Sequence, residues 1–224
     1  LRAIADIDDA ALYILVAAET GAALSFPPAI SILEQRLVLS NLIRVRDTDM
    51  DFARSLALAD GFLDFVQSVQ DEGLTLEALD HVVAAEFATH WQITLDFLNI
   101  LRTVWPEYMA TTGQMDDQAR RIALFQHLTH MWKNTPPDHP VMVAGVTGSL
   151  PYVAEFMAVV ADMPTGTVIL PGYDPDLPQD HQDKIDPQHP QYTLMQTLAR
   201  MNKTRADVVV WSGASPESSD TARG

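Results

Sequence analysis

Between residues 27 and 136 the apolar side chains recur at steps of three and four residues, which is the period of an amphipathic helix. Ser31 and Glu34 have the spacing of a capping box, which predicts the start of a helix. A second apolar series runs from residue 52 to Gly73, a residue type that commonly ends helices. Further helices are predicted at 76–87, at 90–105 before Pro106, and up to the sequence NTPP (134–137). Each has one apolar stripe, so we expect these helices to pack on one another.

The pattern changes after Pro140. The runs VMVA (141–144) and TVIL (167–170) are short, apolar and rich in β-branched residues, as in parallel strands that are covered on both faces. A helix predicted at 151–163 lies between them and completes a β–α–β unit. We also expect a helix at 192–201 and a strand at 207–211, with the sequence DVVVW.

These patterns divide the chain into four parts. We predict a leading segment (1–26) that belongs with the α/β portion, a helical subdomain (27–136), an α/β portion (137–212) and a flexible tail (213–224). The predicted fold class is therefore α/β, with a parallel sheet and a large all-helical insertion.

Charge and composition narrow the possible partners. The 30 acidic residues outnumber the 14 basic ones and give a net charge of −16, which repels phosphate backbones. The sequence contains no cysteine, so disulfides and thiolate metal sites are excluded. The longest apolar run (10–18) is about half of the ~20 residues that a membrane-spanning helix needs. We expect a cytoplasmic protein with no membrane partner.

The turn after the first predicted strand is the strongest candidate for a nucleotide site, and it contains Gly145, Thr147, Gly148 and Ser149. A working P-loop needs a lysine that neutralises the phosphates, but no Lys or Arg occurs between Lys133 and Lys184. A helicase strand of this kind would end in acidic residues that hold magnesium, whereas this one ends at residues 144 and 145, Ala-Gly. The turn therefore has the outline of a degenerate nucleotide site, in which we expect positive φ at Gly148.

A dinucleotide site of the Rossmann type is the alternative interpretation. Gly145 and Gly148 follow a strand, and Asp174 follows the next strand, where an acid can bind a ribose. The third glycine of the fingerprint is missing, because Leu150 and Pro151 occupy that region. A small dinucleotide-binding enzyme thus stays open as the alternative.

Five blocks, in the same order, carry a family resemblance. They are ADIDD (5–9), FPPAISILEQRLVLSNLI (26–43), HWQITLDFL (90–98), AGVTGSLPYVAEFMAVVADMPTGTVILPGYDPDL (144–177) and HPQYTLMQTLAR (189–200). Together they closely resemble AddB subunits of the bacterial AddAB helicase–nucleases, in their alphaproteobacterial form. Val146, Leu150 and Tyr173 depart from the family pattern, which has Ser, Ile and Leu there. These departures do not alter the interpretation.

The resemblance implies a role in DNA double-strand-break repair and recombination. It implies an internal fragment of the helicase-like half of AddB, with a degenerate, RecA-like, P-loop NTPase-like fold and an AddA-like helicase–nuclease subunit as partner. That half has largely lost motor function and is implicated in scanning for the Chi sequence. We therefore expect no catalytic residue, metal or cofactor in this segment. DNA would be bound in the context of the full complex, with possible contacts from five basic residues: Arg120, Arg121, Arg200, Lys203 and Arg205.

Overall fold

The computed structural model describes residues 26–74, 99–174, 177 and 185–210, together with Val16 and Ala18. The helix predicted at 76–87 and the tail predicted at 213–224 lie outside these residues. Within them the protein is rich in helix and contains a small parallel sheet of two strands, which agrees with the predicted α/β class.

The first two described helices form an antiparallel pair, α2 (Ile32–Arg46) and α3 (Phe52–Asp71). Both begin as the sequence predicts. The Ser31 hydroxyl accepts a hydrogen bond from the Glu34 amide at 3.2 Å, and the side chain of Asp51 caps α3 in the same way. Gly73, with φ of 68°, follows the end of α3, which confirms the predicted stop.

Pro106 disturbs the helical path but does not end it. Residues Ile100–Val104 form a π-helical turn, η4, which continues directly into α5 (Trp105–Thr112). A proline lacks an N–H donor and its ring crowds the carbonyl four residues earlier, so a wider turn before it relieves the clash. Helix α6 (Asp117–Asn134) then begins at the N-cap Asp116 and ends near the predicted NTPP sequence.

The α/β half is built around strands β1 (Val141–Ala144) and β2 (Gly166–Ile169), which pair in parallel with Val141 opposite Gly166. Helix α7 (Pro151–Asp162) connects them, so the predicted β–α–β unit is confirmed. Helix α9 (Pro190–Arg200) and a single 3₁₀ turn, η5 (Arg205–Asp207), follow.

The strand predicted at 207–211 is wrong over its described part. Asp207 ends η5, and residues 208–210 form no strand. Val209 is 87% exposed and Val210 67% exposed, and neither pairs with β1 or β2. An apolar, β-branched run forms a strand only where a paired edge is available to it.

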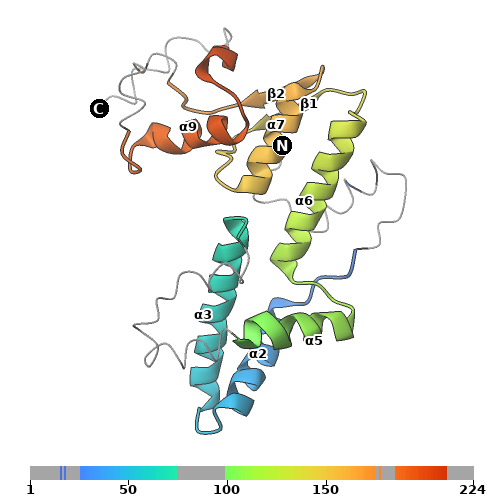
Figure 1. Cartoon of the computed structure of the whole chain (residues 1–224), viewed down its shortest axis with the longest axis vertical. Helices are drawn as coiled ribbons and strands as arrows, with labels where there is room; N and C mark the ends of the chain where they lie inside the picture. The colour runs from blue at the N-terminus through green and yellow to red at the C-terminus, as the bar shows by residue number, and fades with distance from the viewer. Residues whose placement is uncertain are drawn as a thin grey trace.

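Two apolar clusters hold the described residues together, and α6 belongs to the one in the α/β half. In Figure 1, α6 runs beside α7 and reaches from the sheet toward α2, α3 and α5. The first cluster is built mainly on α6 and α7, and its buried members include Leu124, Phe125, Leu128, Trp132, Val143, Phe156, Met157 and Val160. The second joins α2, α3, η4 and α5 through Leu39, Ile43, Ala59, Val66, Leu101 and Trp105. The division into domains at residues 136 and 137 stays a prediction.

No helix in the described part of the chain is long and apolar enough to cross a membrane.

A buried hydroxyl pair ties α2 to α3 and gives a stability test. Ser40 and Ser55 are both fully buried, with their Oγ atoms 2.7 Å apart. Ser55 donates to the Phe52 carbonyl at 2.9 Å, so Ser40 donates to Ser55. We expect Ser55→Ala to lower the free energy of unfolding by about 1–3 kcal/mol, because the Ser40 hydroxyl loses its acceptor.

The double variant Ser40→Ala/Ser55→Ala is the matched control, since it removes both polar groups. Its free energy of unfolding should be closer to that of wild type than the value for Ser55→Ala is. Urea unfolding followed by circular dichroism measures all three. A double variant less stable than the single one would contradict this account.

Candidate functional site

The glycine turn follows the carboxyl end of β1, the edge of a parallel sheet where ligands usually bind. Both glycines have left-handed backbone conformations, with φ of 76° at Gly145 and 63° at Gly148. The positive φ predicted for Gly148 is therefore confirmed. Helix α7 begins immediately after the turn, with Pro151 in its first turn and no side-chain cap at Leu150.

Two side chains of helix α9 donate hydrogen bonds to backbone carbonyl groups of the turn. The Thr197 hydroxyl donates to the carbonyl of Thr147, and the Arg200 guanidinium donates to the carbonyl of Ser149. Arg200 also lies 4.0 Å from the carboxylate of Glu72, just beyond α3. Helix α9 therefore holds the turn in place from one side.

Gly148 is buried beneath α9. A Cβ placed on Gly148 would lie 2.5 Å from Cγ2 of Thr197 and 3.0 Å from the sulfur of Met157. At Gly145, by contrast, an added Cβ would meet no atom within 4 Å. The close backbone approach that glycine permits at 148 thus serves helix packing.

The other side of the turn faces a cavity of about 300 Å³. The turn, α3, α6 and α7 all contribute to it. Its lining residues are Gln67, Asp71, Gln118, Arg121, Phe125, Gly145, Val146, Thr147, Ser149, Leu150, Tyr152 and Val153. The structure therefore brings three of the four predicted turn residues to one cavity, while Gly148 faces α9.

Asp71 and Arg121 are the charged groups of this cavity lining. Burial raises the pKa of the Asp71 carboxyl, while hydrogen bonding from Gln118 and the charge of Arg121 oppose that rise. Burial, and next the nearby Asp71 carboxylate, raise the pKa of Tyr152. Tyr152 is therefore a weaker acid than usual and stays a neutral phenol at neutral pH.

The paired carboxylates with which a helicase holds magnesium are not among the described residues that line this cavity. Asp71 is the one carboxylate among the described lining residues, and Arg121 balances its charge. The lining carries one acid and one base and has no net charge. What it offers is a small, mainly apolar space with a few hydrogen-bonding groups.

The alternative dinucleotide site gains no support from this geometry. A pyrophosphate would have to approach the backbone closely at Gly148, and the side chain of Thr197 occupies that space. Asp174, the candidate ribose ligand, is exposed and its amide donates to the Gln191 side chain of α9 at 3.0 Å.

Each of the five basic residues predicted to contact DNA lies near a backbone carbonyl or a carboxylate of this protein. Arg120 donates to the Pro27 carbonyl at 3.0 Å, and Arg205 donates to the Leu177 carbonyl at 2.5 Å. Arg200 contacts the glycine turn, and Arg121 lies near Asp71 in the cavity. These contacts do not test whether the same residues also reach DNA, which stays a prediction.

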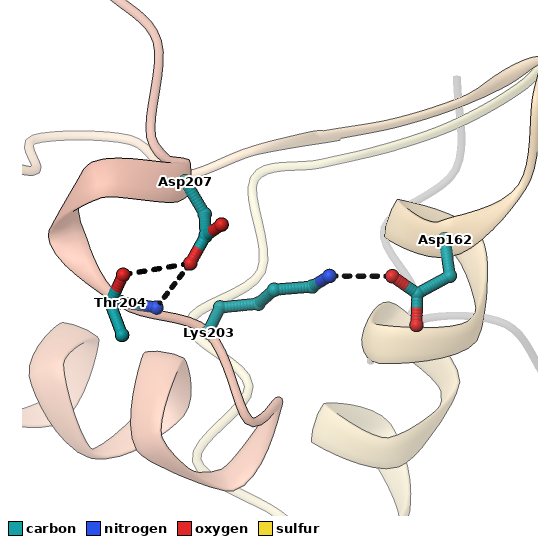
Figure 2. A network of polar contacts seen from close by, with 4 residues as sticks. All are labelled: Asp162, Lys203, Thr204 and Asp207. Atoms are coloured by element: carbon teal, nitrogen blue, oxygen red, sulfur yellow. Dashed lines mark hydrogen bonds and ion pairs between the residues drawn. The ribbon is translucent and has the colours of Figure 1, made fainter.

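Lys203 is the fifth of these residues, and Figure 2 shows its surroundings. Its ammonium group lies 2.5 Å from the Asp162 carboxylate at the end of α7. Next to it, Asp207 accepts hydrogen bonds from the amide and hydroxyl of Thr204 at 2.7 and 2.8 Å. Those two bonds lower the pKa of Asp207. The network holds the segment after α9 against α7.

Comparisons with protein-family models, with curated proteins and with solved structures give no match for this chain.

The sequence did not indicate the polar residues that surround the turn. Asp71 is the last residue of α3, Gln118 lies in the first turn of α6, and Tyr152 is the second residue of α7. They meet only through tertiary packing. A threonine inside a helix, such as Thr197, carries no local signal that it will cover a glycine.

The two glycines make a matched pair for testing the turn. Gly145→Ala should lower the free energy of unfolding by about 1–2 kcal/mol, because alanine is strained in the left-handed region. Gly148→Ala should cost about 1–3 kcal/mol more, since its methyl group also overlaps Thr197. Denaturant unfolding of both variants measures the difference.

Thr197→Ser supplies the control, because it removes Cγ2 and keeps the hydroxyl. In the Gly148→Ala background it should restore part of the stability, and in the Gly145→Ala background it should restore none. Equal costs for the two glycine variants would show that α9 does not press on the turn.

Asp71 gives a prediction on pH. Its folded-state pKa is raised above the ordinary value of about 3.8, so the folded protein holds this proton more tightly than the unfolded chain. Its ionisation therefore lowers stability as the pH rises from about 3.8 through the folded-state pKa. This loss does not occur in Asp71→Asn. The free energy of unfolding of the variant should therefore rise relative to that of wild type as the pH increases from 3 to 7.

Urea unfolding at a series of pH values measures this gain. Asp138→Asn, at an exposed carboxylate, controls for the removal of one negative charge. If the stability of wild type instead rose relative to that of Asp71→Asn with rising pH, the hydrogen bond from Gln118 and the charge of Arg121 would outweigh burial.

Proposed function

We propose that this chain is a non-catalytic, helicase-like part of an AddB-type subunit that serves as a scaffold and guides DNA during double-strand-break repair. In this role it works beside an AddA-like helicase–nuclease subunit, which supplies the motor, and contributes to scanning for Chi. A degenerate RecA-like origin for the β–α–β portion belongs to the same proposal. The five ordered sequence blocks are its basis.

One structural observation carries the non-catalytic part of the proposal. The turn at the carboxyl end of β1 has no acidic residue and no lysine, and α9 binds the carbonyls of Thr147 and Ser149. Of the described residues that line the cavity beside it, Asp71 alone carries a carboxylate. The groups that would bind magnesium and activate a water molecule in a helicase are therefore not in this turn.

Charge supports a guiding role within a complex more than independent DNA binding. Counterion release on neutralising phosphates supplies most of the non-specific affinity for DNA, and a net charge of −16 opposes it. The isolated chain should bind duplex DNA weakly. Tight binding would then come from the partner subunit and from the rest of an AddB-type protein.

Co-expression with a tagged AddA-type subunit of the same organism tests the proposal. We expect this chain to be retained on the tagged subunit, and the complex to bind duplex ends far more tightly than the chain alone. Within the complex, Arg120→Gln/Arg121→Gln should lower the slope of log affinity against log salt by about one for each phosphate that these arginines neutralise. Arg54→Gln, at an exposed residue outside the candidate set, is the control.

Calorimetric titration with ATP–magnesium and with NAD separates this proposal from the dinucleotide-binding alternative. No binding in the micromolar range is expected for either. Micromolar binding of NAD would favour the alternative. Failure of the chain to associate with the AddA-type subunit would contradict the proposed role.

A further inference from the structure

A second cavity, of about 440 Å³, lies between α2, α3 and the start of α6, and we refer to it as the acidic groove. It is separate from the glycine turn, although Gln67 and Gln118 line both spaces. The residues around it are Ile32, Gln35, Arg36, Asp60, Leu63, Asp64, Val66, Gln67, Gln70, Asp116, Asp117 and Gln118.

The groove is negatively charged even after its internal ion pair is counted. Arg36 binds Asp60 through two parallel contacts, Nε to Oδ1 at 2.5 Å and Nη2 to Oδ2 at 2.9 Å. Four aspartates against one arginine leave three negative charges in the lining. Asp64 on α3 and Asp116 at the start of α6 belong to different walls. One oxygen of Asp116 accepts the Ala119 amide at 3.0 Å, and a carboxylate can accept further bonds.

Two glutamine side chains provide an independent sign that the groove takes a ligand. Gln35 lines the groove and is only 5% exposed, yet its side-chain amide forms no hydrogen bond with the residues that the structure describes. The Oε1 atom of Gln70 is also buried and accepts no hydrogen bond from the described residues. A polar atom that is buried without a partner destabilises the folded state, so a ligand that donates a hydrogen bond to the Gln70 oxygen would offset that cost.

The chemistry favours an organic cation over a metal ion. Within the described ranges, no cluster of three or more histidine, aspartate or glutamate residues has the geometry to hold a metal. A nucleic acid is disfavoured by the negative charge. The lining combines carboxylates and amide oxygens with the apolar side chains of Ile32, Leu63 and Val66. A lysine or arginine side chain matches both parts, since its stem is apolar and its head is a charged donor.

The apolar surface beside the groove indicates a protein segment as the source of that cation. Ile32 at the groove is 68% exposed. Leu33 and Leu37, one helical turn apart on α2, are 63% and 39% exposed. Ile32, Leu33 and Leu37 form an exposed apolar stripe on α2. In a peptide with apolar residues on either side of a basic residue, the apolar residues would cover this stripe while the basic side chain enters the groove.

We propose that the acidic groove binds a lysine or arginine side chain of a partner protein, with neighbouring apolar residues of the same segment on the exposed stripe of α2. The acceptors are Asp64, Asp116 and the amide oxygens of Gln35 and Gln70. This assignment does not depend on the function proposed above, and it holds for any partner that presents such a segment.

A fluorescent eight-residue peptide, with leucines around one lysine and one arginine, is the probe for the test with the full chain. Its matched control carries acetyl-lysine and citrulline, which keep the shape and remove both charges. We expect anisotropy titrations to show at least tenfold weaker binding of the neutral peptide.

The double variant Asp64→Asn/Asp116→Asn should weaken binding of the charged peptide by roughly tenfold, and asparagine at 116 still caps α6. Asp138→Asn/Glu155→Gln changes the net charge equally at exposed residues outside the groove and should leave binding unchanged. Gln35→Met, of similar volume, should weaken binding severalfold without lowering stability, because the residue it replaces makes no hydrogen bond.

Three results would overturn the proposal. Equal weakening by the groove and control variants would show attraction to net charge alone. Displacement of the peptide by spermidine at equal concentration would assign the groove to small polyamines. No binding of the charged peptide up to millimolar concentration would leave the groove without this function.

Discussion

The aromatic contact between α6 and α7 is the constraint on which both cavities depend. Phe125 of α6 packs against Tyr152 and Phe156 of α7, with ring centroids 5.4 and 5.7 Å apart, and Trp132 lies 5.4 Å from Phe156. Such pairs contribute about 0.5–1.5 kcal/mol each beyond the area they bury. They fix the rotation of α6 about its axis. That rotation places Gln118 and Arg121 beside the glycine turn, and Asp116 and Asp117 at the acidic groove.

Three basic residues near α9 connect it to other segments of the α/β half. In the α/β half, Arg200, Lys203 and Arg205 each contact a different segment: the glycine turn, the end of α7 and the loop at Leu177. The Lys203–Asp162 pair is partly exposed, with side-chain exposures of 26% and 66%, and it contributes little energy by itself. The pair joins the segment just after α9 to the end of α7, and within α9 itself Thr197 covers Gly148. Two hydrogen bonds to backbone carbonyls and one ion pair thus accompany the buried packing of α9.

Features that depend on residues close in sequence could be predicted, whereas features that depend on tertiary packing could not. The starts of α2 and α7, the end of α3 and the positive φ of Gly148 depend on a few neighbouring residues, and the sequence predicted them. The strand expected at 207–211 depended on pairing with another strand, and residues 208–210 pair with neither β1 nor β2. The π turn before Pro106 reflects a clash that can be relieved in several ways. The cavity beside the turn joins Asp71, Gln118 and Tyr152 across long sequence separations, so no local pattern marks it.

The glycine turn shows why a partial fingerprint cannot by itself identify a nucleotide site. Glycine is required wherever a second body must approach the backbone closely, and that body can be a phosphate or a helix. At Gly148 it is α9, through the methyl group of Thr197. At Gly145 the requirement is only the left-handed dihedral angle, since the space above it is open. A strand, a glycine turn and a helix can therefore share the outline of a nucleotide site when the close approach that glycine permits is made by the protein's own helix.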